Sequence, residues 1–304
     1  MNNTINIKVT QPVNDGIGAS LASLLQIISL SNKAKTGDNI HIDLSLVSFV
    51  HPTLILPLTI LVKALGSQGC NISFNYNANS SNYFNTICFP SGWNPKEKEN
   101  WQEQLTRFAN KTYIPILAIP CTTADEVFRD VTLTLLGNII RTQIGLSGQL
   151  FTAISYMLAE IFDNIVEHAR IENGWVMVQN YKHLNYLDIC IADSGQGILN
   201  SYLRNNCENI QNHEQAINKA INGLSTKNYE GNRGYGIRTS RHMLVNGLGG
   251  SYFMFSGNAF YIWNKEIEQI TPLNVQFNWS GTLVVLRIPK VADENFSFYD
   301  YIGN

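Results

Sequence analysis

The chain has no excess of positive charge. Its 21 Lys and Arg residues are balanced by 23 Asp and Glu residues, which gives a formal net charge of −2 at pH 7. Proteins that bind nucleic acids or anionic membranes usually carry a clustered basic excess. We therefore expect neither a nucleic acid nor a membrane among its partners.

The chain contains few cysteines, and their spacing shows no recognisable motif. The five cysteines are odd in number, scattered along the chain and never spaced as CxxC. This spacing argues against a disulfide framework and against a zinc site. Reduced thiols are typical of the cytoplasm, which is the location we expect.

Long apolar runs are missing as well. The N-terminus has no charged-then-apolar signal pattern. The most apolar stretch, residues 49–65, is short for a bilayer span and is interrupted by Pro52, Pro57 and Lys63. The chain does contain 304 residues, of which 44% are hydrophobic and 11% aromatic, enough for the cores of two modest domains.

The first third predicts a small α/β domain over residues 1–90. Alternating residues predict strands at 5–9 and 40–45, and NISFNY predicts a third at 71–76. Apolar segments at 20–30 and up to Leu65 predict the intervening helices. This order of strand, helix and strand is typical of a parallel sheet.

A linker and a second domain are predicted to follow. Residues 91–111 combine the helix-breaking residues Gly92 and Pro95 with the charged run KEKENWQEQ, which indicates a linker with a short helix. Residues 112–292 form the second predicted domain, and 293–304 a polar and aromatic tail. In the second domain we expect a polar segment at 200–230. Helices are predicted at 125–141, after Ser147 and after Gly236. Strands are predicted at 114–119, 174–181, 186–193, near 252 and at 283–288.

The first motif that bears on chemistry is EIFDNIVEH, residues 160–168. Glu160, Asn164 and His168 are four residues apart and so share one side of a helix. A carboxylate can orient or deprotonate a nucleophile, an amide oxygen suits Mg²⁺, and an imidazole can donate to phosphate oxygens. Taken alone, the pattern is more typical of an ordinary amphipathic helix with a solvated polar face.

The second motif is ICIADSGQGI, residues 189–198. An apolar strand runs directly into Asp193, followed by Gly195 and Gly197. Glycines let the backbone approach a ligand closely, and a carboxylate at a strand end can accept a hydrogen bond from the adenine amine. An ordinary β-turn is the alternative for this composition.

The third motif is a glycine-rich loop that opens a helix. Thr226 and Lys227 precede a short spacer, and Arg233, Gly234 and Gly236 lead into the helix. Backbone N–H groups at such a helix start can cradle phosphates, and the two basic side chains add positive charge. A flexible surface loop is the alternative.

The order of the three motifs resembles the GHKL superfamily of ATPases and kinases, which has the Bergerat fold. GYGIRTSRHMLVNGLGGSYFMFSG and the strand GTLVVLRIP extend the resemblance to about residues 112–292. The resemblance implies an α+β chain whose C-terminal part is a two-layer α/β sandwich that binds Mg-ATP. It implies that Asn164 binds Mg²⁺, that Asp193 binds the adenine amine, and that Gly195 and Gly197 shape the base pocket.

Further residue roles follow from the same resemblance. Residues 199–230 would be the mobile ATP lid, and the backbone of Gly234 and Gly236 would contact the phosphates. His168 and Lys227 are candidate phosphate contacts, and Thr226 and Arg233 are further candidates for binding the nucleotide. Thr282 would support the base pocket through water.

Glu160 helps to choose among the branches of this superfamily. Histidine kinases commonly lack this acid, whereas ATP-hydrolysing members and anti-sigma-factor kinases carry one that resembles their general base. We therefore expect an ATPase or an anti-sigma-kinase-like switch whose lid closes on the nucleotide and alters an interface with a regulatory protein partner. The alternatives are a non-catalytic ATP-binding module and a histidine kinase acting in trans, and a homodimer is compatible with each.

The first domain resembles the STAS fold of anti-sigma-factor antagonists. DLSLVSFVHPT, residues 43–53, is followed by an apolar helix, and Thr53 falls near the phosphorylatable hydroxyl of that family. His51 and Leu54 replace the usual acid and glycine. An ordinary helix start beside Pro52 is the alternative interpretation of Thr53.

Overall fold

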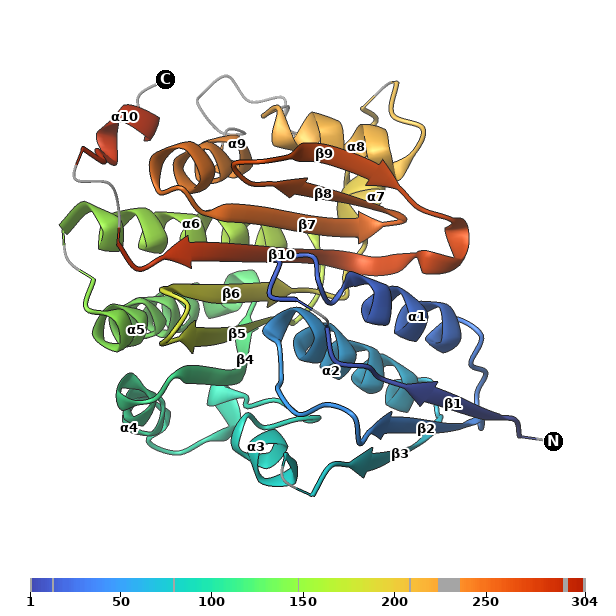
Figure 1. Cartoon of the computed structure of the whole chain (residues 1–304). Helices are drawn as coiled ribbons and strands as arrows, with labels where there is room; N and C mark the ends of the chain where they lie inside the picture. The colour runs from blue at the N-terminus through green and yellow to red at the C-terminus, as the bar shows by residue number, and fades with distance from the viewer. Residues whose placement is uncertain are drawn as a thin grey trace.

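The protein is described by a computed structural model with two β-sheets and helices between and around them (Figure 1). The structure describes residues 2–12, 14–78, 80–146, 148–207, 209–223, 236–291 and 295–302. Mixed α/β structure is thereby confirmed, with one parallel sheet of three strands and one antiparallel sheet of seven strands.

The smaller sheet confirms the parallel unit predicted for the N-terminal part. Its strands lie in the order β1 (Thr4–Lys8), β2 (Asn39–Leu44) and β3 (Asn71–Tyr76). Helices α1 (Leu21–Ser31) and α2 (Pro52–Ser67) connect them. In β2 every second side chain is buried against these helices, which is the alternation that the sequence displays.

The outer face of this parallel sheet is polar. Side chains pair across β2 and β3 in register, with Asn71 donating to Asn39 at 3.3 Å and Asn75 donating to Asp43 at 3.0 Å. Parallel sheets usually have both faces covered and read as continuous apolar runs. In β2 and β3, polar and apolar side chains alternate, so only the apolar face needs to be covered by helices. The polar face can remain in contact with water.

The larger sheet is antiparallel throughout and has the order β4-β5-β6-β10-β7-β8-β9. Its strands are β4 (Tyr113–Pro120), β5 (Asn173–Tyr181), β6 (Tyr186–Ala192), β7 (Ser251–Gly257), β8 (Ala259–Trp263), β9 (Glu268–Pro272) and β10 (Trp279–Pro289). Strands β8 and β9 were not predicted. The other five lie where the sequence predicts them.

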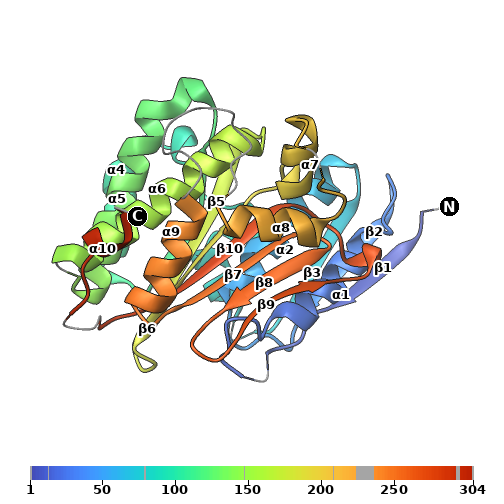
Figure 2. The same ribbon diagram turned by 90° about the horizontal axis from the view of Figure 1, so that it is seen from above.

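Helices cover both faces of the larger sheet. On one face lie α5 (Glu126–Ile144), α6 (Gly148–His168), α7 (Gly197–Arg204), α8 (His213–Ile221) and α9 (Gly236–His242), which continues as a π-helical turn over Met243–Gly247 (Figure 2). On the other face lie α1 and α2. In β6, Ile189 and Ile191 face the first helix layer, whereas Cys190 and Ala192 face the second.

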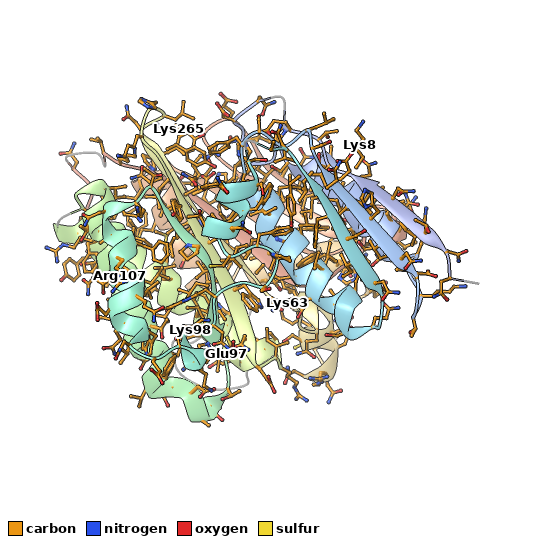
Figure 3. The ribbon with its side chains drawn as sticks, turned by 90° about the horizontal axis from the view of Figure 1, so that it is seen from below. Lys8, Lys63, Glu97, Lys98, Arg107 and Lys265 are labelled. Carbon is orange, nitrogen blue, oxygen red and sulfur yellow. The ribbon has the colours of Figure 1, made fainter. Side chains whose placement is uncertain are left out.

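Charged side chains join the N-terminal unit to the larger sheet. Asp188 of β6 is 1% exposed and pairs with Arg287 of β10 through two hydrogen bonds of 2.8 Å. Arg287 also donates to the backbone oxygen of Asp15 and lies over the ring of Tyr186. Figure 3 labels Lys63 of α2. Its Nζ lies 4.7 Å from the ring centroid of Trp175 in β5. Helices α1 and α2 form one layer that packs against both sheets.

Thr53 lies inside this helix layer. It is 9% exposed, and its hydroxyl donates to Ser20 Oγ at 3.0 Å. Pro52 opens α2 immediately before it. The structure thus gives Thr53 a packing and hydrogen-bonding environment at a helix start and does not present its hydroxyl to solvent.

The segment predicted as a linker is packed against the larger sheet. It contains two short 3₁₀ turns (Pro95–Glu97 and Arg107–Asn110) and α4 (Trp101–Thr106), in agreement with the predicted short helix. A further short helix, α3 (Ser81–Thr86), precedes it. Trp93 and Leu105 are buried in the core shared with α5 and α6. The helix-breaking residues Gly92 and Pro95 shorten the helices of this segment, and the buried side chains of Trp93 and Leu105 anchor it to the core.

Residues 197–221, which overlap the predicted polar segment, are mostly helical. Helices α7 and α8 form a small core of their own in which Tyr202, Ile210 and Ala216 are buried. The segment is rich in Asn, but the apolar residues of α8 recur at the three- and four-residue spacing of a helix and are buried: Ala216, Ile217, Ala220 and Ile221. Between α7 and α8, Asn212 caps α8 by accepting from the N–H of Gln215 at 2.9 Å.

The C-terminal segment returns to the helices of the larger unit. Phe298 is 6% exposed and belongs to the core formed with α5 and α6, and a short helix, α10 (Tyr299–Ile302), follows it. Figure 1 shows α10 close to one end of α6 and α9. Within the described ranges, no helix combines the length and apolarity needed to cross a membrane.

Candidate functional site

Helix α6 carries the first motif, and its amphipathic pattern determines which side faces the sheet. Ile154, Met157, Ile161 and Ile165 are among its buried residues. Their three- and four-residue spacing directs them into the core, which leaves Glu160, Asn164 and His168 partly exposed along one side. The predicted alignment of these three residues is therefore confirmed. Ser147, after which this helix was predicted, lies outside the described residues.

The Glu160 carboxylate lies against the start of α9. A Cβ atom added to Gly236 would overlap Glu160 Oε2, so any larger residue at position 236 would displace this carboxylate. Glu160 is half-buried, and burial raises the pKa of its carboxyl group, with Asp163 and Glu167 acting in the same direction. A hydrogen bond from Tyr156 lowers this pKa and partly offsets these effects. The first and third motifs thus meet at Glu160 and Gly236.

Asn164 lies one turn beyond Glu160. Its Nδ2 donates to the backbone oxygen of Glu160 at 2.7 Å, which fixes the orientation of the amide. This bond uses a donor and leaves Oδ1 as the atom that can coordinate a cation. The described residues contain no group of three or more His, Cys, Asp and Glu arranged for a metal ion.

His168 ends α6 and contacts the second motif. Its Nδ1 lies 3.2 Å from Ser201 Oγ in α7, and its backbone oxygen accepts a hydrogen bond from Gln196. Its Nε2 lies 3.7 Å from a carboxylate oxygen of Glu167. The side chain therefore lies beside the loop that follows β6, at the opposite end of the motif from Gly236.

Asp193 follows the last residue of β6 and is almost completely buried. It is 2% exposed, and its two carboxylate oxygens accept from the N–H of Gly195 at 2.7 Å and from the N–H of Thr282 at 3.1 Å. Burial raises the pKa of Asp193 to about 7, although both N–H donors act to lower it. A buried carboxyl group that titrates near neutrality is a candidate for a functional site.

Gly195 lets the loop after Asp193 pack on the end of α6. A Cβ atom at this position would overlap the backbone oxygen of Ala169, and Gln196 N–H donates to that same oxygen at 3.3 Å. Gly197 then opens α7 with a φ angle of 73°. The second motif therefore contacts the first one through backbone atoms.

Ser256 is a site residue that the sequence motifs did not reveal. It is fully buried in β7, accepts from the N–H of Ile198 at 3.1 Å and donates to the backbone oxygen of Gly281 at 2.8 Å. These bonds connect the start of α7 to the strand that carries Thr282. A lone serine in a strand carries no motif, so only the tertiary structure identifies it.

The two ends of this arrangement are separated along α6. Ala169 lies about 13 Å beyond Glu160 at 1.5 Å per residue. One end combines Glu160, Asn164 and the start of α9, and the other combines Asp193, Gly195 and Thr282. Such a separation suits an extended nucleoside triphosphate, with phosphates at one end and the base at the other. Thr226, Lys227, Arg233 and Gly234, which the sequence also predicts for the site, lie outside the described residues.

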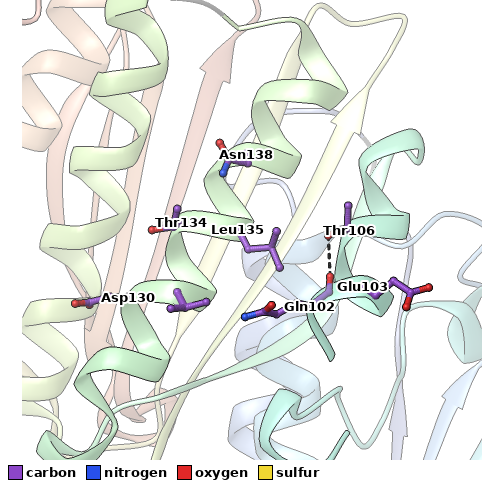
Figure 4. A pocket seen from close by; sticks show the side chains of 8 residues that line it. Gln102, Glu103, Thr106, Asp130, Thr134, Leu135 and Asn138 are labelled. Carbon is purple, nitrogen blue, oxygen red and sulfur yellow. Dashed lines mark hydrogen bonds between the residues drawn. The ribbon is translucent and has the colours of Figure 1, made fainter. Parts of the chain in front are cut away.

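A separate groove of about 460 Å³ lies between α4 and α5 (Figure 4). Its lining contains none of the predicted site residues and includes Glu103 and Asp130 beside Val131 and Leu135. The groove is therefore a different surface from the one that α6 presents.

Comparison of the chain with protein-family models, with curated proteins and with solved structures gave no match.

Proposed function

We propose that this protein binds Mg-ATP along α6 and acts as an ATPase or a protein kinase-like switch of the GHKL type. The observation that carries the proposal is that the second motif and Gly236, the described end of the third, both pack on the helix that carries the first motif. Glu160 lies against Gly236, and the Asp193 loop packs on Ala169 at the other end. The proposed domain has the Bergerat fold, and the N-terminal unit is proposed to be STAS-like.

Asp193 supports an adenine base at its end of the site. Each carboxylate oxygen has one N–H donor already and keeps a further lone pair that can accept the adenine amine. Asp193 and Thr282 are joined by a second hydrogen bond, in which the Asp193 N–H donates to the backbone oxygen of Thr282 at 2.9 Å. This bond holds the carboxylate rigidly at the end of the strand. Rigid polar groups in a buried site are what specific recognition of a base requires.

Asn164 and Glu160 support Mg²⁺ and phosphates at the other end. Mg²⁺ prefers oxygen ligands and commonly completes its coordination with substrate phosphates, so one amide oxygen from the protein is adequate. When bound, the ion would neutralise charge on the transferred phosphoryl group. The Asn164 amide is oriented for this role by its hydrogen bond to the helix.

Glu160 is the proposed general base. A water molecule or a protein hydroxyl would attack the γ-phosphorus, its proton would pass to the Glu160 carboxylate, and the bond to the β–γ bridging oxygen would break to release ADP. Because burial raises the pKa of Glu160, its carboxylate is a stronger base than one in water. A protein that responds to nucleotide in this way is suited to regulating a protein partner.

Removing the Asn164 amide tests the metal-binding part of this proposal. Asn164→Ala is expected to weaken ATP binding in magnesium about tenfold, and to have little effect in EDTA, because the lost oxygen acts only through the ion. Calorimetric titrations under the two conditions measure this difference. Asn138→Ala, on the neighbouring helix α5, is the matched control. Equal weakening with and without magnesium would instead assign Asn164 a structural role in α6.

A further inference from the structure

A buried arginine in α9 joins four elements of the larger unit. Arg241 is 5% exposed, and its Nε donates to the backbone oxygen of Ile221, the last residue of α8, at 2.9 Å. Its Nη1 donates to the Tyr261 hydroxyl of β8 at 2.7 Å and to a carboxylate oxygen of Glu268 in β9 at 2.8 Å. The Tyr261 hydroxyl donates to the same Glu268 oxygen at 2.8 Å, which closes the network.

This network depends on the shape of the arginine side chain. The planar guanidinium presents its donors in a fixed fork, so one side chain can bond a helix carbonyl and a carboxylate in different directions. The Ile221 carbonyl belongs to the last turn of α8, where backbone oxygens have no partner within the helix. The guanidinium also lies 4.8 Å from the ring centroid of Trp263 in β8. Arg241 therefore fixes α9 to α8 and to two strands at once.

The same helix carries the glycine that lies against Glu160. Helix α9 begins at Gly236, about one and a half turns before Arg241, and it packs against α6 as well as α8. Because α9 is only 7 residues long, an anchor near its end also fixes its start. Gly236 leaves no room for a Cβ atom beside the Glu160 carboxylate. The position of Gly236 relative to α6 thus depends on how the partners of Arg241 hold α9.

We infer that Arg241 is a positioning residue that holds α9 against α6 and, through α9, places the Gly236 backbone where the phosphates of ATP are proposed to bind. The inference rests on the proposed function, because Glu160 and Gly236 form its proposed phosphate end. The hydrogen bonds of Arg241 go to α8, β8 and β9, so the side chain acts on this end only through α9. Its effect should be confined to the phosphates and absent from the base, which is proposed to bind at Asp193.

Arg241→Lys tests this role. Lysine keeps the positive charge but has no fork, so it cannot bond Ile221 and Glu268 in the same geometry. ATP affinity in magnesium is expected to fall about tenfold, whereas adenosine affinity should stay unchanged, because only the phosphates meet α9. Competition titrations against a fluorescent adenine nucleotide measure both affinities. A role in stability alone would lower the unfolding temperature without changing the ratio of the two affinities.

Milder variants keep the test decisive if Arg241→Lys does not fold. Glu268→Gln keeps an oxygen that can accept both hydrogen bonds but removes the charge, at a side chain that is 48% exposed. Tyr261→Phe removes one hydroxyl from the network. Both should lower the ATP affinity by less than Arg241→Lys and leave the adenosine affinity unchanged. Arg107→Lys is the matched control, because it makes the same change in a surface ion pair with Glu103, where both side chains are 71% exposed.

Hydrogen exchange of the α9 amides follows the anchor without any nucleotide, and it should be faster in Arg241→Lys than in the wild type. Faster exchange with an unchanged ratio of ATP to adenosine affinity would overturn the positioning role and leave the proposed function standing. Unchanged exchange and an unchanged ratio in the folded variants would overturn it as well. A wild type that binds neither ATP nor adenosine would contradict the proposed function and, with it, the role of Arg241, whatever the exchange shows.

Discussion

Glu160→Gln is expected to lower ATP turnover by about a hundredfold or more while ATP affinity changes little. The amide preserves the size of the side chain but cannot accept the proton of the attacking water or hydroxyl. In phosphoryl transfer the acid mainly orients the nucleophile, so the loss falls on the chemical step. Since Glu160 Oε2 lies against Gly236 in the structure, the substitution acts where the phosphates are proposed to bind.

Phosphate release at saturating ATP, and phosphate transfer to a candidate partner protein, measure this effect. Glu126→Gln is the matched control, because it makes the same change at an exposed position of the neighbouring helix α5. A wild type that binds ATP but shows no turnover, with or without its partner, would favour the alternative of a pure binding module. A Glu160→Gln variant as fast as an active wild type would remove Glu160 from the mechanism.

Asp193→Asn is expected to weaken ATP binding about ten- to a hundredfold. A hydrogen bond to a charged group contributes about 1.5–3 kcal/mol, and the amide presents a donor where the adenine amine needs an acceptor. The amide also cannot accept from both Gly195 and Thr282, so its NH₂ group must face one N–H donor. Calorimetry measures the affinity, and thermal unfolding verifies that the variant is folded.

The pH dependence of binding tests the same residue in the wild type. Burial raises the pKa of Asp193 to about 7, so the free protein holds a proton on this carboxyl group below that pH. The adenine amine is expected to bind the ionised form, which means that binding releases the proton. Affinity should therefore rise ~tenfold between pH 6 and 8. Ionisation of the phosphates is common to both proteins, so the difference from Asp193→Asn isolates this group.

Asp188→Asn is the matched control for both experiments. Asp188 is buried on the same strand, but it faces the N-terminal unit and pairs with Arg287. Its substitution should lower stability, because Arg287 loses its ionic partner, and should leave the ATP affinity of the folded protein unchanged. Equal loss of affinity in the two variants would assign the effect to the strand and not to the base pocket.

Local patterns in the sequence predicted much of the fold. The alternation in IHIDL fixes which side of β2 is buried, and the three- and four-residue spacing in α6 places Glu160 and Asn164 on its open side. The run LDICIA is apolar on both faces of its strand because helices cover both sides of the larger sheet. The sequence does not show which helices cover the second face of the larger sheet. Helices α1 and α2 cover it, through contacts between residues far apart in the chain.

Other features depend on contacts that no local pattern encodes. Strands β8 and β9 are short and extend a sheet whose position is set by β7. Ser256 gains its role from partners on other elements, Ile198 and Gly281, which are far away in the sequence.

Binding of ATP by the wild-type protein is the measurement that tests the central claim most directly. Calorimetric titration in magnesium should show saturable binding of one ATP per chain and much weaker binding of GTP. The reason for this selectivity is that guanine presents a carbonyl oxygen to the Asp193 carboxylate where adenine presents an amine. No detectable binding of any adenine nucleotide to the folded protein, or equal binding of ATP and GTP, would contradict the site assembled along α6.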